Sequence, residues 1–160
     1  MSLAQTLARF DDRLPPVLVK EVRQMLRGRA FVGAFLVANA FAGELVDRGG
    51  HLVTVGSVAD HAAFPGNAAY AASKYGLRGL HEVMTAEYAP RGLRTTLISP
   101  GATDTAAWDS VDPDRHEDLP DRAGMLRPED VADAVLFAVS RPPHANVDLM
   151  WLNPTGKNRS

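Results

Sequence analysis

The chain has 160 residues, 46% of them hydrophobic and 22% charged, a balance typical of one soluble globular domain. Its formal net charge is −2 and its 17 lysines and arginines are scattered, so the sequence lacks the basic patch with which proteins bind nucleic acid or anionic membranes. It contains no cysteine, which excludes disulfides and thiolate metal sites. It also has no apolar run of membrane-spanning length and no secretory signal. We therefore expect a cytoplasmic protein with neither nucleic acid nor membrane as a partner.

The first half of the chain alternates between helical and strand-like patterns. Apolar residues recur at helical spacing over about 16–45, which predicts one long helix, or two with a bend at the Arg-Gly-Arg of 27–29. The Arg-Gly-Gly of 48–50 ends this helical region, and the β-branched run of 51–57 predicts a strand. A further helix is predicted over about 68–89, because Pro-Arg-Gly follows it as a typical helix stop.

The second half continues the alternation. The sequence LRTTLISPG predicts a strand over 93–101, and a long polar stretch follows. A helix is predicted over 127–139, since proline and acidic residues occupy its first turn, and VDLMWLN predicts a last strand over 147–153. Apolar strands joined by helices indicate an α/β fold with a parallel sheet of about three strands and flanking helices, in a single domain over 1–160.

Ligands of open parallel sheets bind beyond the carboxyl ends of the strands, which here are Gly56-Ser57 and the loop that begins at Pro100-Gly101. Tyr70 and Lys74 lie on one face of the helix that follows Ser57, because they are four residues apart. A phenol beside an ammonium and a serine hydroxyl describe an acid/base site for interconverting carbonyls and alcohols. The alternative is a surface helix with a packed Tyr and an exposed Lys, since a bare Tyr-x-x-x-Lys also arises by chance.

Three stretches, VTVGSVADHAAFPGNAAYAASKYGLRGL, LRTTLISPGATDT and RPEDVADAVLFAVS, resemble the catalytic and C-terminal portion of the short-chain dehydrogenase/reductases over roughly 28–153. The resemblance implies a partial Rossmann-like, doubly wound sheet and an oxidoreductase that uses NAD or NADP on a small-molecule carbonyl or alcohol. It implies that Tyr70 is the catalytic acid/base, that Lys74 binds the nicotinamide ribose and favours the phenolate, and that Ser57 polarises the substrate carbonyl. The segments 1–27 and 154–160 would be a helical N-terminal region and a tail.

The same resemblance assigns cofactor contacts to the loop after the second strand. Pro100 and Gly101 would turn the chain so that the backbone around Thr103 holds the nicotinamide carboxamide, and Thr105 would contact the amide or phosphate end of the cofactor. Tyr70 and Lys74 would face the cofactor as well. The polar stretch 106–124 would form the substrate lid.

The sequence also departs from this family. The Gly-rich turn G-x-x-x-G-x-G, which seats the cofactor pyrophosphate, and the Asn-Ala-Gly segment of the fourth strand have no counterpart, and Ala30 replaces a catalytic Asn. The strand over 51–57 would then lie at a sheet edge, so we expect a homo-oligomer or a complementing chain. Two function classes stay open, namely an oxidoreductase and a non-catalytic remnant that acts as an oligomerising or structural partner.

Other features favour structural roles. No metal site is predicted, because no histidines pair at metal-ligand spacing; they stand at 51, 61, 81, 116 and 144. The acidic stretch 109–114 lacks the glycine turn of a calcium loop and is interpreted as a solvated loop. Trp108 fits a substrate pocket or packing equally well, whereas for Trp151, on a strand, packing in a core or interface is expected.

Overall fold

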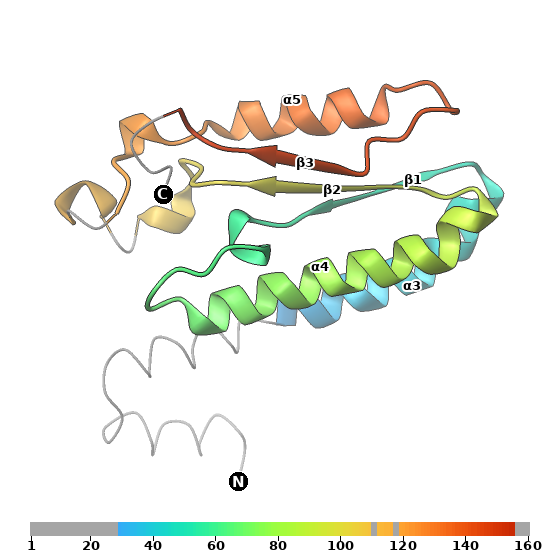
Figure 1. The fold of residues 1–160 in the computed structure, drawn as a ribbon, viewed down its shortest axis with the longest axis horizontal. Helices are drawn as coiled ribbons and strands as arrows, with labels where there is room; N and C mark the ends of the chain where they lie inside the picture. Colours follow the sequence, from blue (N-terminus) through green and yellow to red (C-terminus); the bar gives the residue numbers. More distant parts are fainter. Residues whose placement is uncertain (1–28, 110–111, 117–118, 156–160) are drawn as a thin grey trace, which may run out of the picture.

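The computed structural model describes residues 29–109, 112–116 and 119–155 (Figure 1). Helices and parallel strands alternate along these residues, as expected for an α/β fold. The longer elements are α3 (Arg29–Asp47), β1 (His51–Val55), α4 (Ala68–Tyr88), β2 (Arg94–Pro100), α5 (Pro128–Val139) and β3 (Leu149–Leu152). Short 3₁₀ helices lie between them: η1 (Val58–Asp60), η2 (Ala89–Arg91), η3 (Ala106–Trp108), η4 (Pro113–Arg115) and η5 (Arg122–Gly124).

The sheet has the strand order β1-β2-β3, and both neighbouring pairs are parallel. The register pairs Val55 with Ile98 and Pro100 with Leu152. Helix α5 covers one face of the sheet and helices α3 and α4 cover the other, so the fold has three layers (Figure 1). The predicted partial Rossmann-like sheet with flanking helices is thereby confirmed. The predicted edge position of the first strand is confirmed as well, because β1 pairs only with β2 among the described residues.

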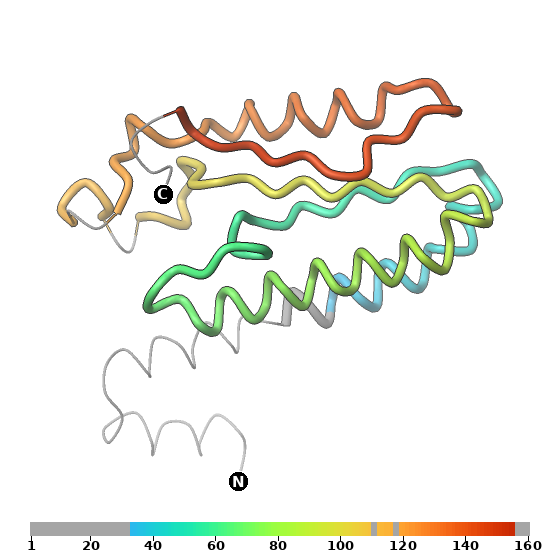
Figure 2. Tube along the Cα trace, in the orientation of Figure 1, coloured from blue at the N-terminus to red at the C-terminus, as the bar shows by residue number. Residues whose placement is uncertain are grey.

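All three strands point in the same direction, so their carboxyl ends meet at one side of the molecule. Figure 2 shows the loops after β1 and β2 together at this end, with the first turns of α4 nearby. The opposite end holds the turns that lead into the strands. Local signals explain the boundaries: Pro128 stands in the first turn of α5, and Gly92 ends the helical region after α4 in a left-handed conformation (φ 96°).

The core centres on β2, which is buried on both faces from Thr95 onward. Ile98 is fully buried, and Met84 of α4 is nearly so. Polar pairs fill part of this core, since the hydroxyl groups of Thr85 and Thr95 lie 2.8 Å apart. A buried hydroxyl needs a hydrogen-bond partner, and here a second hydroxyl supplies it.

Several sequence expectations fall partly outside the described residues. The part of the predicted first helix before residue 29 lies there, as do the proposed N-terminal region 1–27 and positions 156–160 of the tail. The described part of that helix ends at Asp47. None of the helices in the described ranges is long and apolar enough to span a bilayer.

Candidate active site

Ser57 stands immediately beyond the carboxyl end of β1. It caps η1 from an extended conformation, and only 8% of its surface is exposed. Its Oγ accepts a hydrogen bond from the backbone N–H of Ala59 at 3.2 Å. Because a hydroxyl can accept one hydrogen bond and still donate its own proton, Ser57 can also donate to a substrate oxygen.

Helix α4 brings Lys74 to the same strand end. The ammonium of Lys74 donates a hydrogen bond to the carbonyl oxygen of Gly56 at 3.0 Å, and Nζ lies 5.7 Å from the centre of the Tyr70 ring. Burial lowers the pKa of Lys74, while the negative charge of Asp60 acts in the opposite direction. Tyr70 itself is 37% exposed, so its ring faces solvent at the mouth of this region.

The predicted cofactor-binding residues lie in the loop after β2. Pro100 is the last residue of that strand, and the Gly101 N–H continues the ladder to the Leu152 carbonyl at 2.7 Å. A Cβ atom on Gly101 would lie 3.0 Å from the Pro154 ring, so the chain turns tightly against the end of β3. The predicted turn at Pro100-Gly101 therefore has a steric basis.

Thr103 and Thr105 differ in their surroundings. The Thr103 hydroxyl donates to the Gly101 carbonyl at 3.0 Å, and the Trp108 indole N–H donates to the Thr103 carbonyl, also at 3.0 Å. Thr105 is exposed and makes no side-chain cap to η3. Thr103 thus serves the shape of the loop, whereas Thr105 is exposed to solvent.

Arg122 ties the polar stretch to the end of this loop. Its guanidinium bonds Asp104 at 2.6 Å and Asp109 at 2.7 Å, and its backbone N–H donates to the Asp114 carboxylate at 2.8 Å. Asp104 and Asp109 therefore share Arg122 as a cationic partner, and Asp112 pairs with Arg115 at 2.8 Å. Positions 110–111 and 117–118 of the stretch lie outside the described residues.

The sequence interpretation missed Asp60, whose side chain is completely buried beside Ser57. Its carboxylate accepts hydrogen bonds from the Ser57 backbone N–H at 3.3 Å and from the Ser99 hydroxyl, and contacts His61 Nδ1 at 2.6 Å. Burial alone would raise the pKa of Asp60, but the hydrogen bonds from Ser99, His61 and Ser57 outweigh burial and lower it. The Ser-x-x-Asp spacing of 57–60 is a capping pattern that could have drawn attention to it.

The histidines have structural surroundings. His81 is buried and its Nδ1 lies 3.0 Å from the Thr54 hydroxyl, while His51 Nε2 lies 2.7 Å from the Thr96 hydroxyl. His61 stacks on Trp151 with ring centres 4.7 Å apart. Within the described ranges, no group of three or more metal-ligating side chains comes together.

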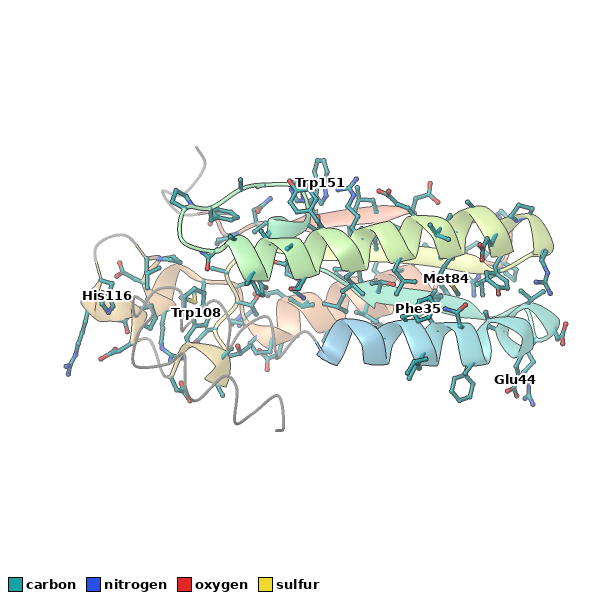
Figure 3. The ribbon with its side chains drawn as sticks, turned by 90° about the horizontal axis from the view of Figure 1, so that it is seen from below. Phe35, Glu44, Met84, Trp108, His116 and Trp151 are labelled. Carbon is teal, nitrogen blue, oxygen red and sulfur yellow. The ribbon has the colours of Figure 1, made fainter. Side chains whose placement is uncertain are left out.

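The two tryptophans lie in different places. Figure 3 shows Trp108 among the loops beyond the strand ends and Trp151 at the side of α4. The indole of Trp108 holds Thr103, so it packs within the loop that carries the predicted cofactor contacts. Trp151 is 56% exposed, so of the two expected places for its packing, core or interface, the core is excluded and the interface stays a prediction. Its strand, β3, is the other edge of the sheet among the described residues.

The site suits the nicotinamide end of a dinucleotide. The Lys74 ammonium has three N–H donors, of which the bond to Gly56 uses one, so donors remain for ribose hydroxyls. For the pyrophosphate, no Gly-rich turn between a strand and a helix occurs in the described part of the chain.

Comparisons with known proteins agree with this arrangement. Residues 20–144 match a family model described as Enoyl-(Acyl carrier protein) reductase. An uncharacterized oxidoreductase of Staphylococcus saprophyticus is 32% identical over 115 residues, which cover 69% of this chain and 47% of that protein. The chain thus spans about half the length of this curated relative.

Two solved structures illustrate the structural similarity. A metagenomic short-chain oxidoreductase (SDR) in complex with NADP has a TM-score of 0.57 and 26% identity, covering 77% of this chain and 47% of that one. A ribose-5-phosphate isomerase from Brucella melitensis has a TM-score of 0.72 and 25% identity, covering 88% and 57%. Because an oxidoreductase and an isomerase share this fold, the fold alone does not decide the chemistry, and the site residues must do so.

Proposed function

Because this chain belongs to the short-chain dehydrogenase/reductase family, we propose that it carries the catalytic part of an NAD- or NADP-dependent oxidoreductase that interconverts a small-molecule carbonyl and an alcohol. The observation that carries the proposal is the bond from the Lys74 ammonium to the Gly56 carbonyl, since it joins helix α4 to the strand end at Ser57. Tyr70, one turn before Lys74, presents an exposed phenol at the same place.

Each of these side chains has a role in the proposed reaction. The bound nicotinamide supplies or accepts the hydride. Tyr70 gives its phenolic proton to the carbonyl oxygen during reduction and takes it back during oxidation. Ser57 donates a hydrogen bond to the same oxygen, which stabilises the negative charge that develops there. The Lys74 ammonium lies near the Tyr70 ring, and its remaining N–H groups bind ribose hydroxyls.

The loop after β2 completes the proposed site. Pro100 and Gly101 set the turn, the backbone at Thr103 binds the nicotinamide carboxamide, and the exposed hydroxyl of Thr105 contacts the cofactor. The engaged state of the Thr103 side chain supports a backbone rather than a hydroxyl contact there.

We further propose that one folded domain, located in the cytoplasm, works as a homo-oligomer or with a complementing chain. Apolar side chains on α3 support an assembled state, since Phe35, Leu36 and Phe41 are all exposed. The unpaired edge of β1 is a second surface that a further strand can cover. Large exposed apolar surfaces of this kind are uncommon on proteins that work as monomers.

The substitution Tyr70→Phe tests the mechanism. It removes the phenolic proton while keeping the ring, so kcat should fall by about 10²- to 10⁴-fold with cofactor binding retained. The measurement is NADH or NADPH turnover with a panel of aldehydes and ketones, together with a fluorescence titration of the cofactor. Tyr75→Phe is the matched control, because Tyr75 is exposed on the same helix without a role in the site.

Unchanged turnover in Tyr70→Phe would contradict the mechanism. The titration also separates the enzyme from the non-catalytic alternative. Saturable micromolar binding of NADH or NADPH by the wild-type chain supports an oxidoreductase, whereas no binding at millimolar cofactor supports a structural or oligomerising partner.

A further inference from the structure

The two oxygens of the buried Asp60 carboxylate serve different parts of the molecule. Oδ2 accepts the backbone N–H of Ser57 at 3.3 Å and the hydroxyl of Ser99, which stands in β2. Oδ1 contacts His61 Nδ1 at 2.6 Å and the Arg78 guanidinium at 3.6 Å. Oδ2 therefore links the ends of β1 and β2. Oδ1 links these strand ends to helix α4 through Arg78.

Gly56 brings the carboxylate close to the strand end. A Cβ atom at position 56 would lie only 2.5 Å from Asp60 Oδ2, a separation that side-chain carbons do not adopt. The peptide of Gly56 thus packs directly against Asp60, and the carbonyl of the same residue accepts the Lys74 ammonium. The carboxylate and the ammonium accordingly hold the same short segment, Gly56-Ser57, from two sides.

We propose that Asp60 is a positioning residue for the catalytic groups: through Oδ2 it fixes the backbone of Ser57, and it sets its negative charge against the same Gly56 whose carbonyl accepts the Lys74 ammonium. The inference rests on the oxidoreductase function proposed above, which gives Ser57 and Lys74 their roles. Asp60 itself touches no reacting atom, because its side chain is fully buried behind the strand end.

Several charged groups face this carboxylate. His61 adjoins it in the chain, and Arg78 approaches it from α4, where Arg78 also pairs with Glu82 at 2.8 Å. Lys74 lies on the same helix, and the negative charge of Asp60 raises the pKa of its ammonium, against the larger lowering by burial. Strand β2 contributes only the neutral Ser99 hydroxyl. Removing the negative charge of Asp60 should therefore change the pKa of the Lys74 ammonium. Removing the Oδ2 oxygen should break the hydrogen bond from the Ser57 backbone N–H.

Two substitutions separate these effects. In Asp60→Asn the amide oxygen can take the place of Oδ2 and keep the hydrogen bonds from Ser57 and Ser99, while the NH₂ group faces His61. This variant retains the shape of the side chain and loses its negative charge. In Asp60→Ala both are lost. Glu82→Gln is the control, since it removes the other carboxylate that pairs with Arg78 and leaves the Asp60 carboxylate in place.

The first experiment is amide hydrogen exchange at Ser57 in the full chain, followed by NMR. Asp60→Ala should speed exchange of the Ser57 amide by about ten- to a hundredfold, as expected for loss of a hydrogen bond to a charged group. Asp60→Asn and Glu82→Gln should leave it close to the wild-type rate. An unchanged Ser57 rate in a folded Asp60→Ala variant would overturn the positioning role.

The second experiment follows the Lys74 ammonium by NMR of ¹³C-labelled lysine. The chain contains only three lysines, so the Lys74 signal can be assigned with Lys74→Arg. The Lys74 signal should titrate at lower pH in both Asp60 variants, because a neighbouring negative charge that stabilises the ammonium is gone. In Glu82→Gln the Lys74 signal should titrate at the same pH as in wild type. An identical titration in wild type and Asp60→Asn would overturn the electrostatic part.

Measuring kcat relates the Ser57 exchange rate and the Lys74 titration to the proposed reaction. If wild type is active, kcat in Asp60→Ala should fall by up to about a hundredfold through misplacement of Ser57, and less in Asp60→Asn. If wild type turns over no substrate, the proposed function fails, yet the exchange and titration data still decide the role of Asp60. The two failures are thus distinguishable.

Discussion

Substitution of Gly56 by Ala tests how tightly the strand end is packed around the candidate site. The added methyl group would lie 2.5 Å from Asp60 Oδ2, 3.2 Å from Leu97 Cδ1 and 3.3 Å from Ser99 Oγ. A carbon cannot stay this close to a carboxylate oxygen, so either the carboxylate or the backbone must move. All three neighbouring side chains are buried, which leaves little free space for such a movement.

The loss of stability follows from the packing or the hydrogen bonds that the added methyl group disrupts. Inserting a methyl group into a packed core costs about 1–3 kcal/mol. If Asp60 moves instead, it weakens hydrogen bonds to a charged group that are worth about 1.5–3 kcal/mol each. The lower entropy of an unfolded chain with Ala offsets about 0.4–1 kcal/mol. We therefore expect Gly56→Ala to lower the free energy of unfolding by roughly 1–2.5 kcal/mol.

Urea denaturation of the two proteins measures this difference directly. Gly79→Ala is the matched control, because Gly79 lies on α4 and a Cβ atom there meets nothing within 4 Å. That variant should gain about 0.5–1 kcal/mol, as expected for replacing Gly inside a helix. If Gly56→Ala unfolds within about 0.5 kcal/mol of wild type, the close packing against Asp60 is not as described, and the argument for the strand end fails.

Two further predictions concern pH and assembly. Burial lowers the pKa of His81 below its ordinary 6.5, so the unfolded chain binds the proton more readily, and the free energy of unfolding should drop between pH 7.5 and 5.5 by up to about 1.4 kcal/mol per pH unit. His81→Gln should flatten this dependence in urea titrations, and an equally steep profile would contradict it. Phe41→Ser should weaken self-association in sedimentation experiments, whereas Leu136→Ser, on the opposite face of the sheet, serves as the control; a monomeric wild type at micromolar concentration would refute the assembly proposal.

The order and type of the elements could be predicted from local patterns. Periodicity, Gly and Pro punctuation and β-branched runs placed the helices and strands within a few residues of their observed bounds, apart from the start of the first helix, which lies outside the described residues. The first strand is shorter than predicted, since it ends at Val55 and Ser57 already caps η1. Its edge position could not come from periodicity, which says nothing of a neighbouring strand; it came from the family resemblance.

The candidate site was only partly predictable for a related reason. Ser57, Tyr70 and Lys74 stand close enough in the chain for motif and helix spacing to connect them. The role of Asp60 depends on Ser99, which lies 39 residues away and reaches the carboxylate only after β1 and β2 have paired. Trp151 shows the same limit, because its exposure depends on what covers the outer edge of β3.

The contact between Lys74 and Gly56 bears on how much the site must rearrange to bind a cofactor. If the ammonium had to leave the Gly56 carbonyl, binding would cost a partly buried hydrogen bond. An ammonium has three donors, and this bond uses one, so the other two can reach ribose hydroxyls while the first stays in place. Burial also lowers the pKa of Lys74, and the charge of Asp60 counteracts that effect. The strand end thus holds the Lys74 side chain in position before any ligand arrives, which reduces the ordering cost of binding.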